Sequence, residues 1–181
     1  MKKLILSCIA ALLVAFQAQA ETPDADNILL LQLKDGPVKI QLFPNKAPNH
    51  VARIKELVRK GFYDGLKFHR VIDGFMAQTG DPKGNGTGGS GQKIKAEFND
   101  LHHGRGTVSM ARAQDPDSAD SQFFICFADA GFLDGQYTAW GQVIEGMEFV
   151  DKIKRGDPNM NGTVTDPDTI VSMKILADTQ K

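Results

Sequence analysis

The amino-acid sequence predicts a mainly β protein, in which roughly eight short antiparallel strands and two helices form a barrel. Short apolar and β-branched runs recur along the chain, separated by turns rich in Gly, Pro, Asp and Asn. Only two segments place apolar residues at helical spacing. A barrel is favoured over an open sheet because closure removes exposed sheet edges. We find no internal repeat and no linker between domains.

The first 20 residues differ in composition from the rest of the 181-residue chain. A lysine pair is followed by the apolar run Leu4–Phe16 and by an A-x-A cleavage site ending at Ala20. We therefore expect a secretory signal peptide at residues 1–20, cleaved after Ala20, and a single domain at residues 21–181. The apolar run is too short to span a bilayer, so no membrane anchor is expected.

Charge and cysteine content narrow the class of protein. The chain has 21 Lys and Arg residues against 22 Asp and Glu, so no basic excess points to a nucleic-acid partner. Removal of the signal peptide would leave Cys126 as the only cysteine, which excludes an internal disulfide. Cys126 lies in the run QFFICF and is expected to be buried. No segment has the character of a strong interface, and a monomer is expected.

In the N-terminal half, residues 28–33 and 38–43 are apolar or alternating runs joined by the turn Lys34–Pro37, which predicts a hairpin. Residues 49–61 form the first predicted helix, because apolar residues recur at helical spacing and Gly61 can end it. This helix is expected to plug the sheet or barrel.

The second half of the chain contains the second predicted helix, residues 147–155, whose apolar face is Phe149, Val150 and Ile153. Residues 113–120 and 157–168 are polar, turn-rich loops. Strands are expected at residues 106–112, 122–127, 139–144 and 169–176.

Between the two halves, the stretch KFHRVIDGFMAQTGD at residues 67–81 predicts a second hairpin, closed by a two-residue turn at Asp73-Gly74. Alternation predicts the faces of its two strands. On the first strand, one face is expected to carry Phe68, Arg70 and Ile72. On the second strand, one face is expected to carry Phe75, Ala77 and Thr79, and the opposite face Met76 and Gln78.

Arg70 is a long cation embedded in this mostly apolar hairpin. A guanidinium is always charged and is rarely buried without a partner or a task. In a structural interpretation, Arg70 forms a salt bridge, or its aliphatic stem carries the guanidinium out to water. A functional interpretation needs support from the rest of the chain.

The glycine-rich loop at residues 80–91 contains a formal G-x-G-x-x-G match at residues 84–89. A dinucleotide site needs a helix directly after those glycines, and residues 92–99 lack a helical apolar stripe. We therefore interpret the glycines as a tightly turned loop. A small-molecule or nucleotide binder is kept as the least favoured alternative.

Other catalytic chemistries lack their motifs. Among the four histidines, none lies near a cysteine pair or in H-E-x-x-H, so no metal site is expected. His102 and His103 are expected in a surface loop. Ser109 and Ser121 lack the G-x-S-x-G elbow of serine hydrolases. What remains is one arginine, several aromatic residues and no nucleophile, a set that could act on a bound apolar peptide without making or breaking bonds.

At this point the sequence resembles the cyclophilin family of peptidyl-prolyl isomerases. FHRVIDGFMAQTGD is similar to the family signature F-H-R-x-I-x-G-F-M-x-Q-x-G-D, and GTGG, SMA, SQFFI and FLDG follow in the family's order. The resemblance covers residues 28–176. It implies a closed eight-stranded antiparallel barrel capped by two α-helices. It also implies catalysis of X-Pro bond rotation without a cofactor.

Site residues follow from the resemblance by motif. Arg70 is implied as the catalytic arginine, assisted by Gln78 and Phe75. The remaining implied substrate-binding residues are Met76, Ala111, Arg112, Ala113, Gln122, Phe124, Phe132, Leu133 and Tyr137.

Three of these positions depart from the common family pattern. Phe132 stands where tryptophan is usual, Tyr137 where histidine is usual, and Arg112 where asparagine is usual. Phe132 is typical of bacterial members and implies weak cyclosporin binding, because the indole N–H donor is missing. Together with the signal peptide, it indicates a bacterial periplasmic isomerase acting on proline-containing segments of unfolded exported proteins. The alternative is a non-catalytic module that holds such segments in the same groove.

Overall fold

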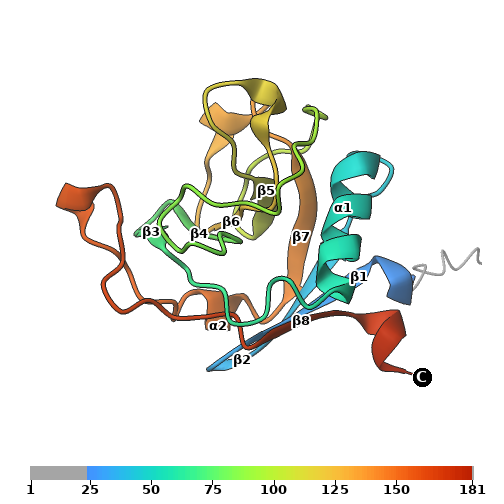
Figure 1. The fold of residues 1–181 in the computed structure, drawn as a ribbon, viewed down its shortest axis with the longest axis horizontal. Coiled ribbons are helices and arrows are strands. Elements are labelled where there is room, and N and C mark those ends of the chain that lie inside the picture. The colour runs from blue at the N-terminus through green and yellow to red at the C-terminus, as the bar shows by residue number, and fades with distance from the viewer. Residues whose placement is uncertain (1–23, 181) are drawn as a thin grey trace, which may run out of the picture.

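The structure is a computed structural model that describes residues 24–180, so the predicted signal peptide lies outside the described residues. An eight-stranded antiparallel sheet curves into a half-barrel (Figure 1), in the order β3-β4-β6-β5-β7-β2-β1-β8. The strands are β1 (Ile28–Leu33), β2 (Gly36–Leu42), β3 (Arg70–Ile72), β4 (Met76–Thr79), β5 (Thr107–Met110), β6 (Phe123–Cys126), β7 (Ala139–Glu145) and β8 (Ser172–Ile175). The helices are α1 (Pro48–Arg59) and α2 (Met147–Val150), with 3₁₀ turns η1 (Ala25–Asn27), η2 (Pro116–Ser118), η3 (Gly131–Leu133), η4 (Pro158–Met160) and η5 (Leu176–Thr179).

The sheet is open, so the predicted closed barrel is wrong. Strands β3 and β8 form the two edges and do not pair with each other. Closure was expected because it protects the edges of a sheet. Instead, a loop at residues 156–164 protects the β3 edge. Val71 donates its N–H to the Gly162 carbonyl at 2.8 Å and accepts from Gly156 N–H at 2.9 Å. Since the loop pairs with the backbone of β3, the edge is covered without barrel closure.

Helix α1 confirms the first predicted helix, and its apolar face lies in the core. Pro48 starts it, where a missing N–H has no consequence. Glu97 accepts the N–H groups of Asn49 and His50, both at 3.0 Å, and so satisfies two free donors of the first turn. Neither α1 nor α2 is long and apolar enough to cross a membrane, and the same holds for every helix in residues 24–180.

Helix α2 is much shorter than the predicted helix at residues 147–155. It ends at Val150, and beyond it the backbone bonds tighten to the i→i+3 type, with Lys152 N donating to Phe149 O and Ile153 N to Val150 O. Such a tight turn does not continue as an α-helix.

The sheet separates two apolar clusters. The larger is the main core, where Phe123 makes edge-to-face contacts with Tyr63 and Trp140 at centroid distances of 5.5 and 5.6 Å. The smaller cluster lies on the opposite face of β4 and β6, and Cys126 belongs to it. Cys126 is fully buried, as predicted, and burial raises the pKa of its thiol to about 12. The buried members of this pocket cluster are Met76, Phe124, Cys126, Ala130 and Leu133.

Candidate active site

Three neighbouring strands place the central residues of the site in one row. The register pairs Arg70 on β3 with Gln78 on β4, and Gln78 with Phe124 on β6. Cross-strand partners share a face of the sheet. The guanidinium, the amide and the ring therefore lie side by side on the face opposite the main core.

A pocket of about 270 Å³ opens on this face. Met76, Phe124 and Leu133 form its buried floor. Phe132 lies on the rim, 65% exposed, with its ring centroid 5.4 Å from that of Phe75. The pocket is lined by Arg70, Phe75, Met76, Gln78, Ala111, Arg112, Phe124, Phe132, Leu133 and Tyr137. Most of these lining residues are apolar or aromatic, and two of them, Arg70 and Arg112, are cations.

The hairpin turn differs from the prediction and explains the place of Phe75. The register pairs Ile72 with Met76, so the turn has three residues, Asp73, Gly74 and Phe75, rather than two. Phe75 therefore precedes β4 and packs in the pocket cluster beside Met76 instead of sharing the face of Ala77.

The predicted alternation also fails at the start of the hairpin. Phe68 packs in the main core, whereas Arg70 lines the pocket. The regular strand begins only at Arg70, and the strict two-residue period applies only within a regular strand.

Arg70 is fixed by three hydrogen bonds to neutral acceptors. Its Nη1 donates to Gln78 Oε1 at 3.2 Å, its Nε to the Asn161 carbonyl at 3.0 Å, and its Nη2 to Asn161 Oδ1 at 2.9 Å. Burial lowers the pKa of the guanidinium, which still remains charged. Within the described part of the chain Arg70 has no carboxylate partner, so the salt-bridge interpretation is wrong.

Asn161 is the site residue that the sequence did not reveal. It follows η4, adopts a left-handed backbone with φ of 53°, and lies 91 residues from Arg70 in the chain. Asn-Gly pairs favour such turns, and Asn161-Gly162 is one. That signal predicts the turn but gives no indication of its partner. Figure 1 shows the loop that carries η4 running past β3.

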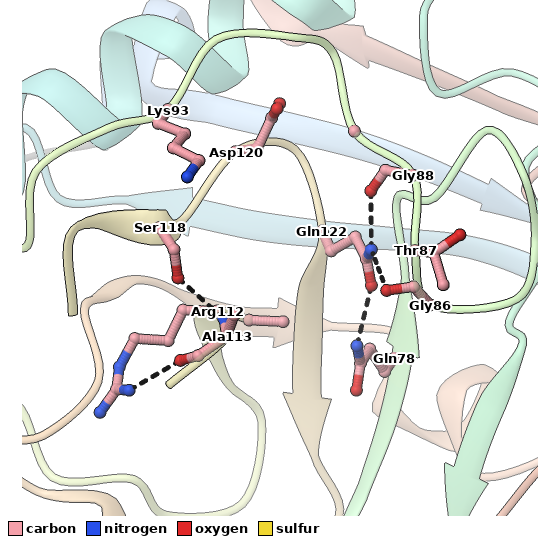
Figure 2. A pocket seen from close by; sticks show the side chains of 12 residues that line it. Gln78, Gly86, Thr87, Gly88, Lys93, Arg112, Ala113, Ser118, Asp120 and Gln122 are labelled. Carbon is pink, nitrogen blue, oxygen red and sulfur yellow. Dashed lines mark hydrogen bonds between the residues drawn. The ribbon is translucent and has the colours of Figure 1, made fainter. Parts of the chain in front are cut away.

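A chain of amides links Arg70 to the glycine-rich loop. Gln78 Nε2 donates to Gln122 Oε1 at 2.9 Å, and Gln122 Nε2 donates to the carbonyls of Gly86 at 3.1 Å and Gly88 at 2.8 Å (Figure 2). No helix follows the glycines before β5. The loop therefore supports the site and lacks the helix that a dinucleotide cradle requires.

Asp81 organises the same loop from within. Its buried carboxylate accepts backbone N–H groups from Lys83 at 2.8 Å, Asn85 at 3.0 Å and Gly86 at 2.6 Å. Burial opposes ionisation of Asp81, but these donors outweigh it and lower its pKa.

A second pocket of about 310 Å³ adjoins the first and shares Gln78, Ala111 and Arg112 with it. Figure 2 shows Lys93 and Asp120 at the edge away from Gln78. The pocket is lined by Gln78, Gly86, Thr87, Gly88, Gly89, Lys93, Ala111, Arg112, Ala113, Ser118, Asp120 and Gln122. The two adjoining pockets, which we call the groove, are together lined by all the predicted site residues.

The backbone at residues 111–113 forms the boundary between the pockets. Ala111 N–H donates to the Gln122 carbonyl at 2.9 Å, and Ala113 N–H donates to Ser118 Oγ at 2.9 Å. The N–H of Arg112 has no acceptor among residues 24–180. It is therefore available to a ligand in the groove.

The side chain of Arg112 is held against the rim. Its guanidinium carbon lies 4.5 Å from the centroid of the Tyr137 ring, and its N–H groups donate to the carbonyls of Ala113, Gln114 and Gln136. The two departures from the family pattern at Arg112 and Tyr137 thus contact each other.

The prediction that His102 and His103 lie in a surface loop is wrong for His103. His102 is exposed, but His103 is 1% exposed and stacks against Phe124 at a centroid distance of 6.3 Å. Burial is tolerated because both ring nitrogens have partners, Asp134 Oδ1 at 2.8 Å and Ser109 Oγ at 3.0 Å. No group of three or more metal-ligating side chains occurs among residues 24–180.

Comparison with known proteins gives the family. The model of the cyclophilin type peptidyl-prolyl cis-trans isomerase family matches residues 28–175. The chain therefore belongs to this family and is an isomerase. A probable peptidyl-prolyl cis-trans isomerase of Brucella suis is 50% identical, over 98% of this chain and 96% of the relative. A peptidyl-prolyl cis-trans isomerase of Synechococcus elongatus is 44% identical, over 82% and 96%.

Solved structures agree with the family. A cyclophilin from Hirschia baltica matches with a TM-score of 0.76 and 30% identity, over 86% of this chain and 76% of that one. A cyclophilin type isomerase from Cryptosporidium parvum, crystallised in the presence of the dipeptide Ala-Pro, matches with a TM-score of 0.75 and 30% identity, over 82% and 98%.

Proposed function

We propose that the protein accelerates X-Pro bond rotation in exported polypeptides, and that Arg70 stabilises the twisted amide. The observation that carries this proposal is the state of Arg70. It is a cation fixed by neutral acceptors, without a carboxylate partner in residues 24–180, at the edge of an apolar pocket. Its charge is therefore available to a substrate.

The proposed mechanism needs no covalent step. Rotation about an X-Pro bond breaks amide resonance, over a barrier of about 18–20 kcal/mol, and takes on the order of 10–100 s unaided. In the twisted state the prolyl nitrogen gains a lone pair that can accept a hydrogen bond from Arg70. Such a bond is stronger in the transition state than in the planar ground state. A barrier lowered by about 7 kcal/mol gives roughly a 10⁵-fold acceleration.

The groove supports one orientation of the substrate. The apolar pocket accepts the proline ring over Phe124 and Met76, while the free N–H of Arg112 binds the peptide backbone. The residues before proline then extend toward the second pocket. The Cryptosporidium parvum relative crystallised with Ala-Pro supports a proline-containing ligand. Phe132 supplies no N–H donor at the rim, so weak cyclosporin binding is expected.

The proposed place of action is the bacterial periplasm, which rests on the signal peptide pattern of residues 1–20. Fractionation of bacteria producing the full chain tests it. We expect the mature protein in the periplasmic fraction, with Glu21 as its first residue. An uncleaved chain retained in the cytoplasm would contradict this proposal but not the catalytic one.

The decisive experiment compares Arg70→Ala with Arg59→Ala, a control at an exposed arginine of α1. The rate of cis-to-trans exchange of an X-Pro peptide should fall roughly 10²–10³-fold in Arg70→Ala and stay unchanged in Arg59→Ala. Both variants should unfold at nearly the wild-type temperature. If Arg70→Ala binds the peptide and isomerises it at the wild-type rate, the arginine mechanism fails. If wild type binds but does not isomerise, the binding-module alternative holds.

A further inference from the structure

His102 joins both ends of the turn that carries two residues of the pocket. Its Nδ1 lies 2.7 Å from Asp134 Oδ2, and its Nε2 lies 2.7 Å from Asp129 Oδ2. These two aspartates bracket η3, which contains Phe132 and Leu133. A single imidazole ring therefore ties the turn at its beginning and at its end.

The geometry requires the charged ring. Two carboxylates need two donors, and only the imidazolium form of histidine has two N–H groups. A neutral ring would direct one lone pair at a carboxylate. Hydrogen bonds from the ring to Asp134 and then to Asp129 raise the pKa of His102. Because His102 is exposed, solvent screens both contacts and their effect is modest.

The contacts continue inward to the pocket floor. Asp134 Oδ1 accepts both the backbone N–H and Nδ1 of His103, each at 2.8 Å. His103 Nε2 meets Ser109 Oγ at 3.0 Å, and Ser109 lies directly opposite Phe124 in the β5–β6 register. The carboxylate that His102 holds thus also orients the ring that stacks against Phe124.

Other titratable and charged groups surround this cluster, and the buried His103 shares Asp134 with His102. The Cys126 thiol has its pKa raised to about 12, by burial and then by Asp134 and Asp129. The nearby cation Arg105 is paired with Asp151 at 2.6 Å. Elsewhere in residues 24–180, burial lowers the pKa of His50 and of His69.

We propose that His102 is a positioning residue of the isomerase, which holds η3 with Phe132 and Leu133 against the pocket only while its ring is protonated. The inference rests on the proposed placement of the proline ring in that pocket. As pH rises through the elevated pKa of His102, one of the two contacts is lost and η3 loosens. KM then rises, while kcat changes less because the contacts of Arg70 are untouched.

The test measures KM and kcat for an X-Pro peptide between about pH 5.5 and 9, alongside the titration of the His102 ring by NMR. For wild type, KM should rise roughly two- to threefold, with a midpoint that matches the ring titration. His102→Arg keeps two donors and a permanent charge, so its KM should stay low throughout. His102→Gln should have, at every pH, the KM that wild type has at high pH. The KM of Asp129→Asn should lie between the low-pH and high-pH values of wild type.

The inference would be overturned by a wild-type KM profile that persists unchanged in His102→Gln, or by a KM rise that survives in His102→Arg. Thermal unfolding of each variant separates these results from a loss of fold. An active wild type with a flat KM also refutes the role of His102. A folded wild type without isomerase activity at any pH refutes instead the proposed catalytic function.

Discussion

Phe123 and Phe124 are neighbours on β6 with different surroundings. Both are buried, at 0% and 5% exposed. Phe123 packs in the main core against the rings of Tyr63 and Trp140, whereas Phe124 makes an edge contact with Tyr137 at 6.0 Å and stacks on His103. Burial alone therefore does not separate a ring of the main core from a ring of the pocket. The polar neighbours of Phe124 make the difference.

The contrast extends to β4. Ala77 faces Ile125 in the register and lies in the main core, while Gln78 faces Phe124 and contacts Arg70. One face of these strands is apolar except for the buried Thr79, and the other combines apolar residues with amides and a cation. Substitutions on the first face should reduce stability, and substitutions on the second should reduce activity.

The largest effect on stability is expected for Phe123→Ala. Removal of this ring leaves a cavity among Tyr63 and Trp140, and should lower the free energy of unfolding by about 3–5 kcal/mol. Urea denaturation measures the loss. The fraction that remains folded should keep the wild-type KM, and a large change in KM would show that the two faces are coupled.

Phe124→Ala is the matched test on the other face. Loss of the pocket floor should lower kcat/KM roughly tenfold or more. The loss of stability should be smaller than for Phe123→Ala, because the pocket side adjoins solvent. Peptide isomerisation and urea denaturation on the same samples give both numbers. Equal losses of stability with unchanged kcat/KM would remove the distinction drawn between the two rings.

A smaller effect is expected from loosening Arg70. Asn161→Gly removes the Oδ1 acceptor but keeps the backbone acceptor and tolerates the φ of 53°. Gln78→Ala removes the contact at Nη1. Hydrogen bonds to charged groups contribute about 1.5–3 kcal/mol, so kcat should fall roughly tenfold in either variant. A fall in KM alone, with kcat preserved, would contradict a positioning role.

The smallest expected effect concerns pH and Asp81. Its unfolded pKa is 3.8, and the folded value is lower. Its contribution to stability is therefore complete above pH 3.8 and disappears as pH falls through the folded value. Asp81→Asn should lower the urea midpoint at neutral pH and reduce its drop in acid. If both proteins lost stability equally on acidification, other carboxylates would account for the effect.

Much of the local structure could be predicted from the sequence, because its causes are local. Alternating apolar runs and turn residues predicted the strands, and helical spacing predicted α1. The run around Cys126 correctly predicted its burial. Arg70 was singled out from its apolar hairpin, while the other site residues came from resemblance to a family rather than from spacing. The structure brings those residues together in two adjoining pockets.

What the sequence did not predict correctly has a common origin, which is contact between segments that are distant in the chain. A loop at residues 156–164 covers the β3 edge, so the sheet stays open. The partner of Arg70 at Asn161 is 91 residues away, and His103 is buried because Asp134 and Ser109 reach its ring.

The sequence by itself determined where strands and α1 form, which residues are apolar, and that a cation lies among them. Only the tertiary structure decided which acceptors hold that cation and whether the sheet closes. Periodicity and turn chemistry act over a few residues, whereas hydrogen-bond partners depend on how distant segments meet in space.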